Sequence, residues 1–514
     1  MSLALALDAL ESVKRHSHSS VLWQALARHV QVLSGTDRQH LLESTATLTL
    51  PSGPGEWLRC SAMAALTQDT AWYARQAEQA DPHTLPDAIF SLMGLVWYHA
   101  LARTADRASL RDCLQQIDLV RLQQHVAGQL PERPPAVRRR LGERLRIAIY
   151  TPHIASPNHG GTLFSLNMLN VLREELAEVI TFSAQENHIP QVASYHGGSE
   201  HLHALDTDLS SLQLQRPGGA RFLIPDTALS LRARLLEIQK AIDTFAPDLV
   251  LFVGFYSPMV FDLYRRYPVL GLSVHALPPI APVDVWLSAD ARAEAVRWQG
   301  IAPPQPFDFP FRFWPTAPFT PLTRDTLGLP DNATVLICVG YRLQDELNPT
   351  WQQHMLDLLE RHPDAHWLLL GVLEIVPDTA LPQHPRIYRI APQASISPWL
   401  ALSDIFINPP RVGGGSAVAQ AMEQGVAIAA MSDGDGGDKL GPYAATTERE
   451  YFATLEHWLN QPDERLAVGQ ALKTRFNQRL DLSGAHASSQ LIQACHQAVE
   501  EFQQRNQRPT NVHD

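Results

Sequence analysis

A chain of 514 residues is too long for one typical domain of ~100–200 residues, so the length predicts about three domains. Lys and Arg number 41, Asp and Glu number 53, and the formal charge of -12 argues against a protein that binds nucleic acid by neutralising phosphates. The chain has four lysines, which limits any lysine-dependent chemistry to Lys14, Lys240, Lys439 and Lys473.

The cysteines and the N-terminus indicate the compartment. Cys60, Cys113, Cys338 and Cys495 lie far apart without CxxC spacing, so we expect reduced thiols rather than a zinc site or disulfides. The first residues lack the basic segment of a signal peptide, and the most apolar stretch, 88–102, is shorter than the ~20 residues that span a bilayer. The sequence therefore predicts a cytoplasmic protein without a membrane span.

Residues 1–128 are predicted to form an all-α domain. Apolar residues recur there at helical spacing, as in Leu22, Leu26, Val30 and Leu33. The region has no 34-residue self-similarity, which argues against a tetratricopeptide array. A polar, proline-bearing stretch at 129–143 interrupts the pattern and is predicted to be a linker.

Beyond the linker, short continuous apolar runs alternate with helical stretches, which is typical of buried parallel strands with crossover helices. We expect one α/β domain at 144–315 and a second at 316–480, and the strands are predicted at 145–150, 248–253, 269–274, 334–339, 366–370, 405–407 and 426–430. The Pro- and Phe-rich run 303–321 is expected to be neither helix nor strand and to connect the two domains. Helical material from 448 to about 506 closes the chain, and 481–514 is expected to be a C-terminal helix and a frayed tail.

The predicted fold class is therefore α/β, with two Rossmann-like, doubly wound domains preceded by an all-α domain. Ligands of such sheets bind beyond the carboxyl ends of the strands, so we expect a cleft between the two domains. A nicotinamide dehydrogenase would share this outline. However, the sequence contains neither the GxGxxG fingerprint nor a Walker A pattern.

A glycine triplet at 413–415 is the most informative feature. It follows the predicted strand 405–407 and precedes a predicted helix at 416–424, so the free amides of the helix start, with the hydroxyl of Ser416, indicate an anion site. A helix terminus contributes only ~0.3–1 kcal/mol per charge, so a diphosphate also needs cations. Arg342 is the first candidate and Lys439 the second. The alternative is a turn that caps the helix and binds nothing.

Several patches between residues 144 and 479 resemble one family in their order and spacing. They lie at 144–150, 158–162, 267–290 and 390–425. They are similar to glycosyltransferases of GT-B fold, most closely to the O-GlcNAc transferases and the cytoplasmic N-glycosyltransferases of the HMW-adhesin type. The resemblance implies that the chain uses no cofactor and transfers a hexose from a nucleotide diphosphate sugar, which we expect to be UDP-linked.

On the donor side, the resemblance assigns Ala391 to a position whose backbone reads uracil, and Gln420 to the position of an acid that binds the ribose. Ser416 matches a phosphate-binding hydroxyl, while Gly415 stands where the family has a histidine. The family's pyrophosphate lysine is absent from the loop 340–349. The expected donor site consists of Arg342, Ala391, Gly414, Gly415, Ser416, Gln420, Asp435 and Lys439.

On the acceptor side, the resemblance places Asn158, His159 and Gly160 in the loop after the first strand. Glycosyl transfer removes a proton from the acceptor, and an imidazole near its reference pKa of ~6.5 suits that task, so His159 is the catalytic candidate. A positioning role for this loop is the alternative. His153 and His275, which also follow apolar strands, are the alternates to His159.

An acidic loop at 433–438 follows another predicted strand and is expected to face the same cleft. Its carboxylates, Asp433, Asp435 and Asp438, either contact the donor sugar or form a solvated turn. Their spacing lacks the remaining ligands of a calcium loop, so no metal is expected.

The predicted function is metal-independent transfer of a hexose of the glucose or GlcNAc type to a protein side chain or a saccharide. Three alternatives stay open. An epimerase shares the GT-B fold, and a pyridoxal-dependent phosphorylase would need Lys439 or Lys473 for its Schiff base. The residues at Gln420 and Gly415 keep a third alternative open, a non-catalytic subunit that binds sugar nucleotides.

Overall fold

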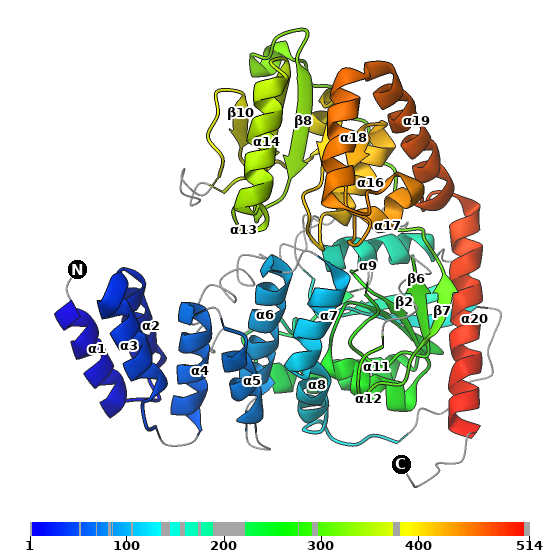
Figure 1. The fold of residues 1–514 in the computed structure, drawn as a ribbon. Helices are drawn as coiled ribbons and strands as arrows, with labels where there is room; N and C mark the ends of the chain where they lie inside the picture. Colours follow the sequence, from blue (N-terminus) through cyan, green and yellow to red (C-terminus); the bar gives the residue numbers. More distant parts are fainter. Residues whose placement is uncertain are drawn as a thin grey trace.

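A computed structural model describes most of the chain. The described residues are 3–50, 53–67, 69–80, 84, 86–103, 106–134, 144–154, 160–172, 176–188, 222–275, 277–289, 297–373 and 381–507. They form an N-terminal row of helices followed by two α/β units, each built on a parallel sheet, which confirms the predicted fold class (Figure 1).

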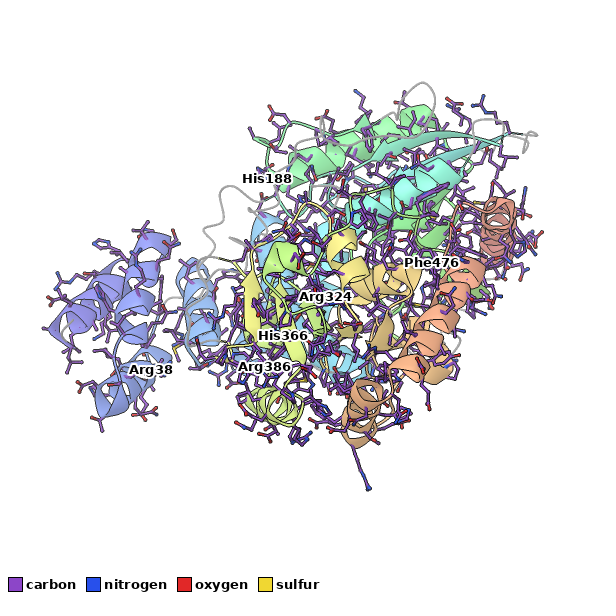
Figure 2. All side chains as sticks on the ribbon, turned by 90° about the horizontal axis from the view of Figure 1, so that it is seen from above. Arg38, His188, Arg324, His366, Arg386 and Phe476 are labelled. Carbon is purple, nitrogen blue, oxygen red and sulfur yellow. The ribbon has the colours of Figure 1, made fainter. Side chains whose placement is uncertain are left out.

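The helical row leads from the start of the chain to the first α/β unit (Figure 1). Its first half has a hydrophobic core of its own around Trp23, Leu26 and Val30, and the part that carries Arg38 stands apart from the rest of the protein in Figure 2. The second half shares a core with the first sheet. The helices are α1 (Leu3–Arg15), α2 (Ser20–Gln31), α3 (Gly35–Ala46), α4 (Pro54–Thr67), α5 (Ala71–Glu78), α6 (Pro86–Arg103), α7 (Arg107–Gln116) and α8 (Leu119–Ala127).

The first α/β unit contains a seven-stranded parallel sheet with the order β3-β2-β1-β4-β5-β6-β7. Its inner strands are buried on both faces, which is why their sequences are almost entirely apolar. The strands are β1 (Leu145–Tyr150), β2 (Ala177–Phe182), β3 (Phe222–Leu223), β4 (Leu249–Val253), β5 (Val269–Leu272), β6 (Val285–Ser288) and β7 (Gln305–Asp308). Its helices include α9 (Gly160–Val171), α11 (Leu231–Phe245) and α12 (Pro258–Arg266).

The expectation that 303–321 contains no strand is wrong at β7. This strand pairs in parallel with β6, with Ser288 opposite Asp308, and it is the last strand of the sheet. An edge strand leaves one side of its backbone unpaired, so it tolerates the missing N–H of Pro306. After β7 the chain crosses to the second unit, and Phe309, Phe311 and Phe313 are buried there.

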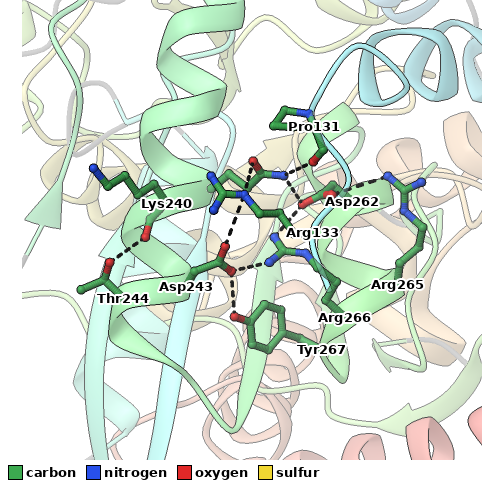
Figure 3. Close-up of polar contacts among 10 residues, drawn as sticks. Pro131, Arg133, Lys240, Asp243, Thr244, Asp262, Arg265, Arg266 and Tyr267 are labelled. Carbon is green, nitrogen blue, oxygen red and sulfur yellow. Dashed lines mark hydrogen bonds and ion pairs between the residues drawn. The ribbon is translucent and has the colours of Figure 1, made fainter. Parts of the chain in front are cut away.

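The start of the predicted linker is held against the first unit by polar contacts (Figure 3). The backbone oxygen of Pro131 accepts a hydrogen bond from Nε2 of Gln239 at 3.3 Å. Nε2 of Gln239 also donates to Asp262 at 3.0 Å, and Asp262 in turn pairs with Arg266 at 2.6 Å. The chain is therefore anchored to α11 and α12 before it enters β1.

The second α/β unit has a five-stranded parallel sheet with the order β10-β9-β8-β11-β12. Its strands are β8 (Thr334–Val339), β9 (Ala365–Leu370), β10 (Ile387–Ile390), β11 (Ile405–Ile407) and β12 (Ala427–Ala429). Its helices are α13 (Leu343–Glu346), α14 (Pro349–Arg361), α15 (Ser397–Leu402), α16 (Gly415–Gln424), α17 (Gly437–Leu440), α18 (Glu448–Asn460) and α19 (Pro462–Arg479), with short 3-10 helices η3 (Asp325–Leu327) and η5 (Gly441–Tyr443).

The last helix, α20 (Ala485–Gln507), returns to the first unit and runs along it (Figure 1). Near its end, Nε of Arg505 donates to Asp284 at 2.9 Å and Nη2 donates to the backbone oxygen of Tyr264 at 2.8 Å. The predicted fraying of 508–514 lies outside the described residues. No helix in the described part of the chain is both long and apolar enough to cross a membrane.

Candidate functional site

A cavity of about 490 Å³ lies where the two α/β units and the helical row meet. Its wall contains residues that follow the carboxyl ends of β1, β4, β5, β8 and β11, which is the edge where ligands bind to open parallel sheets. Helix α6 of the helical row adds Gly94 and Trp97. The volume falls within the ~300–1,000 Å³ of small-molecule sites.

The glycine triplet of Gly413, Gly414 and Gly415 lines this cavity at the start of α16. Gly414 caps the helix with a φ of +93°, which glycine adopts readily. A Cβ on Gly415 would lie 2.7 Å from the backbone oxygen of Asp435 and 2.8 Å from Nζ of Lys439. Because the first amides of a helix lack helical partners, the triplet and Ser416 give the cavity a backbone wall suited to phosphate.

Two of the predicted cations flank the triplet. Nη2 of Arg342 donates to Oε1 of Glu346 at 2.9 Å, while its Nε is buried and has no hydrogen-bond partner among the described residues. Nζ of Lys439 donates to the backbone oxygen of Asp435 and to Oδ1 of Asp438, at 2.9 Å from the latter. A guanidinium has five N–H donors and an ammonium has three, so both side chains keep hydrogen-bonding capacity for a ligand.

Arg411 is a cavity residue that the sequence reasoning missed, although an arginine two residues before a glycine triplet is a visible signal. It is buried, it pairs with Glu346, and it donates to the backbone oxygen of Val339 at 2.8 Å and to Oδ1 of Asn408 at 2.9 Å. Burial would raise the pKa of Glu346, but Arg411 and Arg342 outweigh it and hold that pKa below its usual value. Arg411 therefore supports the site through Glu346 and Asn408.

Arg312 is a second cavity cation that the sequence reasoning missed. Its guanidinium donates to backbone oxygens, including those of Phe311 at 2.9 Å and Leu287 at 2.8 Å. Burial lowers the pKa of Arg312 to about 10, although Asp438 and Asp308 oppose the shift. Among the described residues, four cationic side chains line the cavity, Arg312, Arg342, Arg411 and Lys439, together with three carboxylates, Glu346, Asp435 and Asp438.

The acidic loop 433–438 faces the cavity with two of its three carboxylates. Asp433 is half exposed, whereas the side chains of Asp435 and Asp438 are 12% and 4% exposed. Oδ2 of Asp435 lies 3.2 Å from Nδ1 of His275, which belongs to the first unit. The loop therefore contacts the first unit across the cleft.

The acceptor side of the cavity is aromatic. The ring of Trp97 lies 4.5 Å from that of His275 and 4.7 Å from that of Phe255, measured between centroids. His153 and Gly160 also line the cavity. Asn158 and His159 lie outside the described residues, so their predicted roles remain predictions.

Two predicted donor residues, Ala391 and Gln420, are both described but do not line the cavity. Ala391 is exposed and follows β10 at the edge of the second sheet. Oε1 of Gln420 accepts a hydrogen bond from the hydroxyl of Ser397 at 3.4 Å. The structure therefore brings together Arg342, Gly414, Gly415, Ser416, Asp435, Lys439, Gly160 and His275 without these two.

A buried carboxyl group, Glu186, lies behind the acceptor side. Its Oε1 accepts hydrogen bonds from the hydroxyl of Tyr150 and, at 2.7 Å, from that of Ser257. Burial raises the pKa of Glu186 to about 8, against the opposing effects of Tyr150, Ser257 and Arg234. The folded protein therefore holds this carboxyl group neutral over a wide pH range.

Replacing Glu186 should change how stability depends on pH. Between its unfolded pKa near 4.5 and about 8, the folded state binds the proton more tightly than the unfolded state, so Glu186 lowers the free energy of unfolding as pH rises. In Glu186→Gln both hydrogen bonds to Oε1 can persist, and this decline should disappear. Urea unfolding of the two proteins between pH 5 and pH 8.5 measures the difference, and parallel profiles would contradict the neutral carboxyl group.

No protein-family model matches the chain, and no curated protein sequence matches it either. Among solved structures, a mutant O-GlcNAc transferase from Thermobaculum terrenum aligns over 98% of this chain and 99% of its own, with 12% identity and a TM-score of 0.57. The glycotransferase of kitacinnamycin aligns over 69% of this chain and 100% of its own, with 13% identity and a TM-score of 0.42. The first alignment extends over the helical row and both α/β units.

Proposed function

We propose that this chain, which has the GT-B fold, is a glycosyltransferase with a nucleotide diphosphate sugar as donor. The proposal is carried by one observation: the glycine triplet, the N-terminus of α16, Arg342 and Lys439 converge on a single cavity between the two sheets. Backbone amides and cations are the groups that hold a diphosphate. They can also stabilise the charge that a diphosphate gains as it leaves the sugar, so the proposed mechanism needs no metal or other cofactor.

The proposed reaction transfers a hexose of the glucose or GlcNAc type, with UDP as the leaving group. The bond from the anomeric carbon to the diphosphate breaks, a bond to the acceptor atom forms, and the acceptor proton passes to a base. The sequence resemblance supports His159 as that base, and Gly160, the next residue, lines the cavity. A protein side chain or a saccharide as acceptor, and a cytoplasmic location, belong to the same proposal.

Replacing Arg342 tests the donor site. Arg342→Ala removes a cation whose Nε is free among the described residues, so we expect UDP binding to weaken ~10- to 100-fold, as for the loss of a ~1.5–3 kcal/mol charge-assisted hydrogen bond. Isothermal titration calorimetry measures the affinity. Arg361→Ala is the matched control, because Arg361 is an exposed arginine of the same unit that pairs with Glu456. Equal UDP affinity in the two variants would contradict the assignment.

Release of UDP from UDP-GlcNAc and UDP-glucose, with peptide and saccharide acceptors present, tests the reaction. His159→Ala should abolish release and leave UDP affinity unchanged. If the wild-type protein binds UDP but forms no UDP from either sugar donor, the result supports the alternative of a non-catalytic subunit. If it binds no nucleotide, the proposed function fails.

A further inference from the structure

We propose that Arg107 of the helical row is a positioning residue for the donor site. Its guanidinium partly neutralises the carboxylate of Asp438. The ammonium of Lys439 is thereby left available to the diphosphate. This inference rests on the proposed function, and it gives the helical row a part in donor binding.

Arg107 is the first residue of α7, and it reaches the second α/β unit. Its side chain is 9% exposed, and its Nη2 donates to the backbone oxygen of Gly434 at 3.1 Å. Its guanidinium also lies 3.8 Å from Oδ1 of Asp433 and 3.9 Å from Oδ2 of Asp438. One arginine thus contacts the acidic loop from a helix that is 327 residues away in the sequence.

The acidic loop packs closely against the segment that carries the glycine triplet. A Cβ on Gly434 would lie 2.7 Å from the backbone oxygen of Arg411, and a Cβ on Gly436 would lie 2.8 Å from Nδ2 of Asn408. The amide of Asp435 donates to the backbone oxygen of Val412 at 2.7 Å. The backbone oxygen of Asp435 in turn sits against Gly415, so a residue that holds the loop also holds the start of α16.

The charges around Asp438 explain the effect on Lys439. Asp438 is the most deeply buried carboxylate of the loop, and burial raises its pKa while Lys439 and Arg107 oppose the shift. A buried carboxylate is costly without an opposite charge. If Arg107 is removed, Asp438 depends more strongly on its ion pair with Lys439, whose Nζ lies 2.9 Å from Oδ1 of Asp438, and the ammonium is then neutralised by Asp438 instead of by the ligand.

Calorimetry with UDP as the probe tests the inference. Arg107→Ala should weaken UDP binding about tenfold, which corresponds to ~1.4 kcal/mol. Arg111→Ala is the matched control, because Arg111 lies one turn along α7 and pairs with its neighbour Asp112. We expect Arg111→Ala to bind UDP as the wild-type protein does.

A second substitution distinguishes charge sharing from a merely structural role. Asp438→Asn removes the carboxylate charge that Arg107 partly neutralises. In the Asp438→Asn background, Arg107→Ala should therefore weaken UDP binding by less than about threefold. If Arg107→Ala does not fold, Arg107→Lys, which keeps the charge, should bind UDP within about threefold of the wild-type protein, and Arg107→Gln should not.

Two results would overturn the inference while the proposed function stands. The first is that Arg107→Ala binds UDP with the affinity of the wild-type protein. The second is that Arg107→Ala lowers UDP affinity tenfold in the Asp438→Asn background as well. Wild-type protein that binds no UDP would instead remove the proposed function, and the inference with it.

Discussion

Gly414→Ala should abolish measurable UDP binding and lower the melting temperature. At φ +93° an alanine is strained, and its Cβ would overlap Oδ1 of Asn408 and lie 2.7 Å from Nη2 of Arg411. We expect a loss of ~1–3 kcal/mol of stability, as for a residue held in a sparsely populated backbone region. We also expect UDP affinity to fall by at least ~100-fold, which corresponds to ~2.7 kcal/mol, because the amides at the start of α16 lose their orientation.

The neighbouring glycine provides the control for stability. Gly413 lies outside the left-handed region, and the nearest atom to a Cβ there would be Nη2 of Arg342 at 3.8 Å, an ordinary contact. Gly413→Ala should therefore keep the wild-type melting temperature in a thermal-shift assay. A wild-type melting temperature and UDP affinity in Gly414→Ala would show that this turn is not constrained as described.

Arg411→Met should destabilise the second α/β unit by about 3–5 kcal/mol, the usual cost of removing one partner of a buried ion pair. Arg411 and Glu346 have side chains that are each 4% exposed, so the substitution leaves a buried carboxylate with Arg342 as its remaining cation in the cluster. Chemical denaturation measures the loss. UDP affinity should fall as well, because Glu346 then competes with the ligand for Arg342.

The double variant Arg411→Met with Glu346→Gln tests this explanation. It removes both charges of the pair, so it should recover more than half of the stability that Arg411→Met loses. It should also free Arg342 for the ligand. If the two substitutions cost stability additively, burial of an unpaired charge is not the cause.

The strands show how far a local pattern reaches. The runs at 145–150, 334–339 and 405–407 coincide with β1, β8 and β11, because a strand buried on both faces is apolar at nearly every position. β7 escaped prediction because its sequence, Gln-Pro-Phe-Asp, lacks that pattern. It is a strand because β6 provides a pairing edge, and that edge exists only in the assembled sheet.

In the candidate site, too, local sequence patterns predict some residues and not others. The glycine triplet and the helix after it could be predicted, because glycine content and a helix start are local properties. The roles of Arg411 and Arg312 could not, because a sequence shows where a cation stands but not which acid or carbonyl group lies beside it. Of the residues that the family resemblance assigned to the donor, Ala391 and Gln420 do not line the cavity. A match between sequence positions does not say where a side chain lies in space.

The length and composition of this chain, with its apolar runs, determined a helical region and two parallel α/β units, because each of these depends on residues that are neighbours in sequence. The four lysines and the charge of -12 imply that the proposed diphosphate would be held by backbone amides and a few cations. Tertiary structure alone decided which cations of the cavity are paired with acidic side chains and which remain available to a ligand. Glu346 couples Arg342 to Arg411, and Arg107 reaches the loop beside Lys439, through distances in space that no sequence pattern encodes.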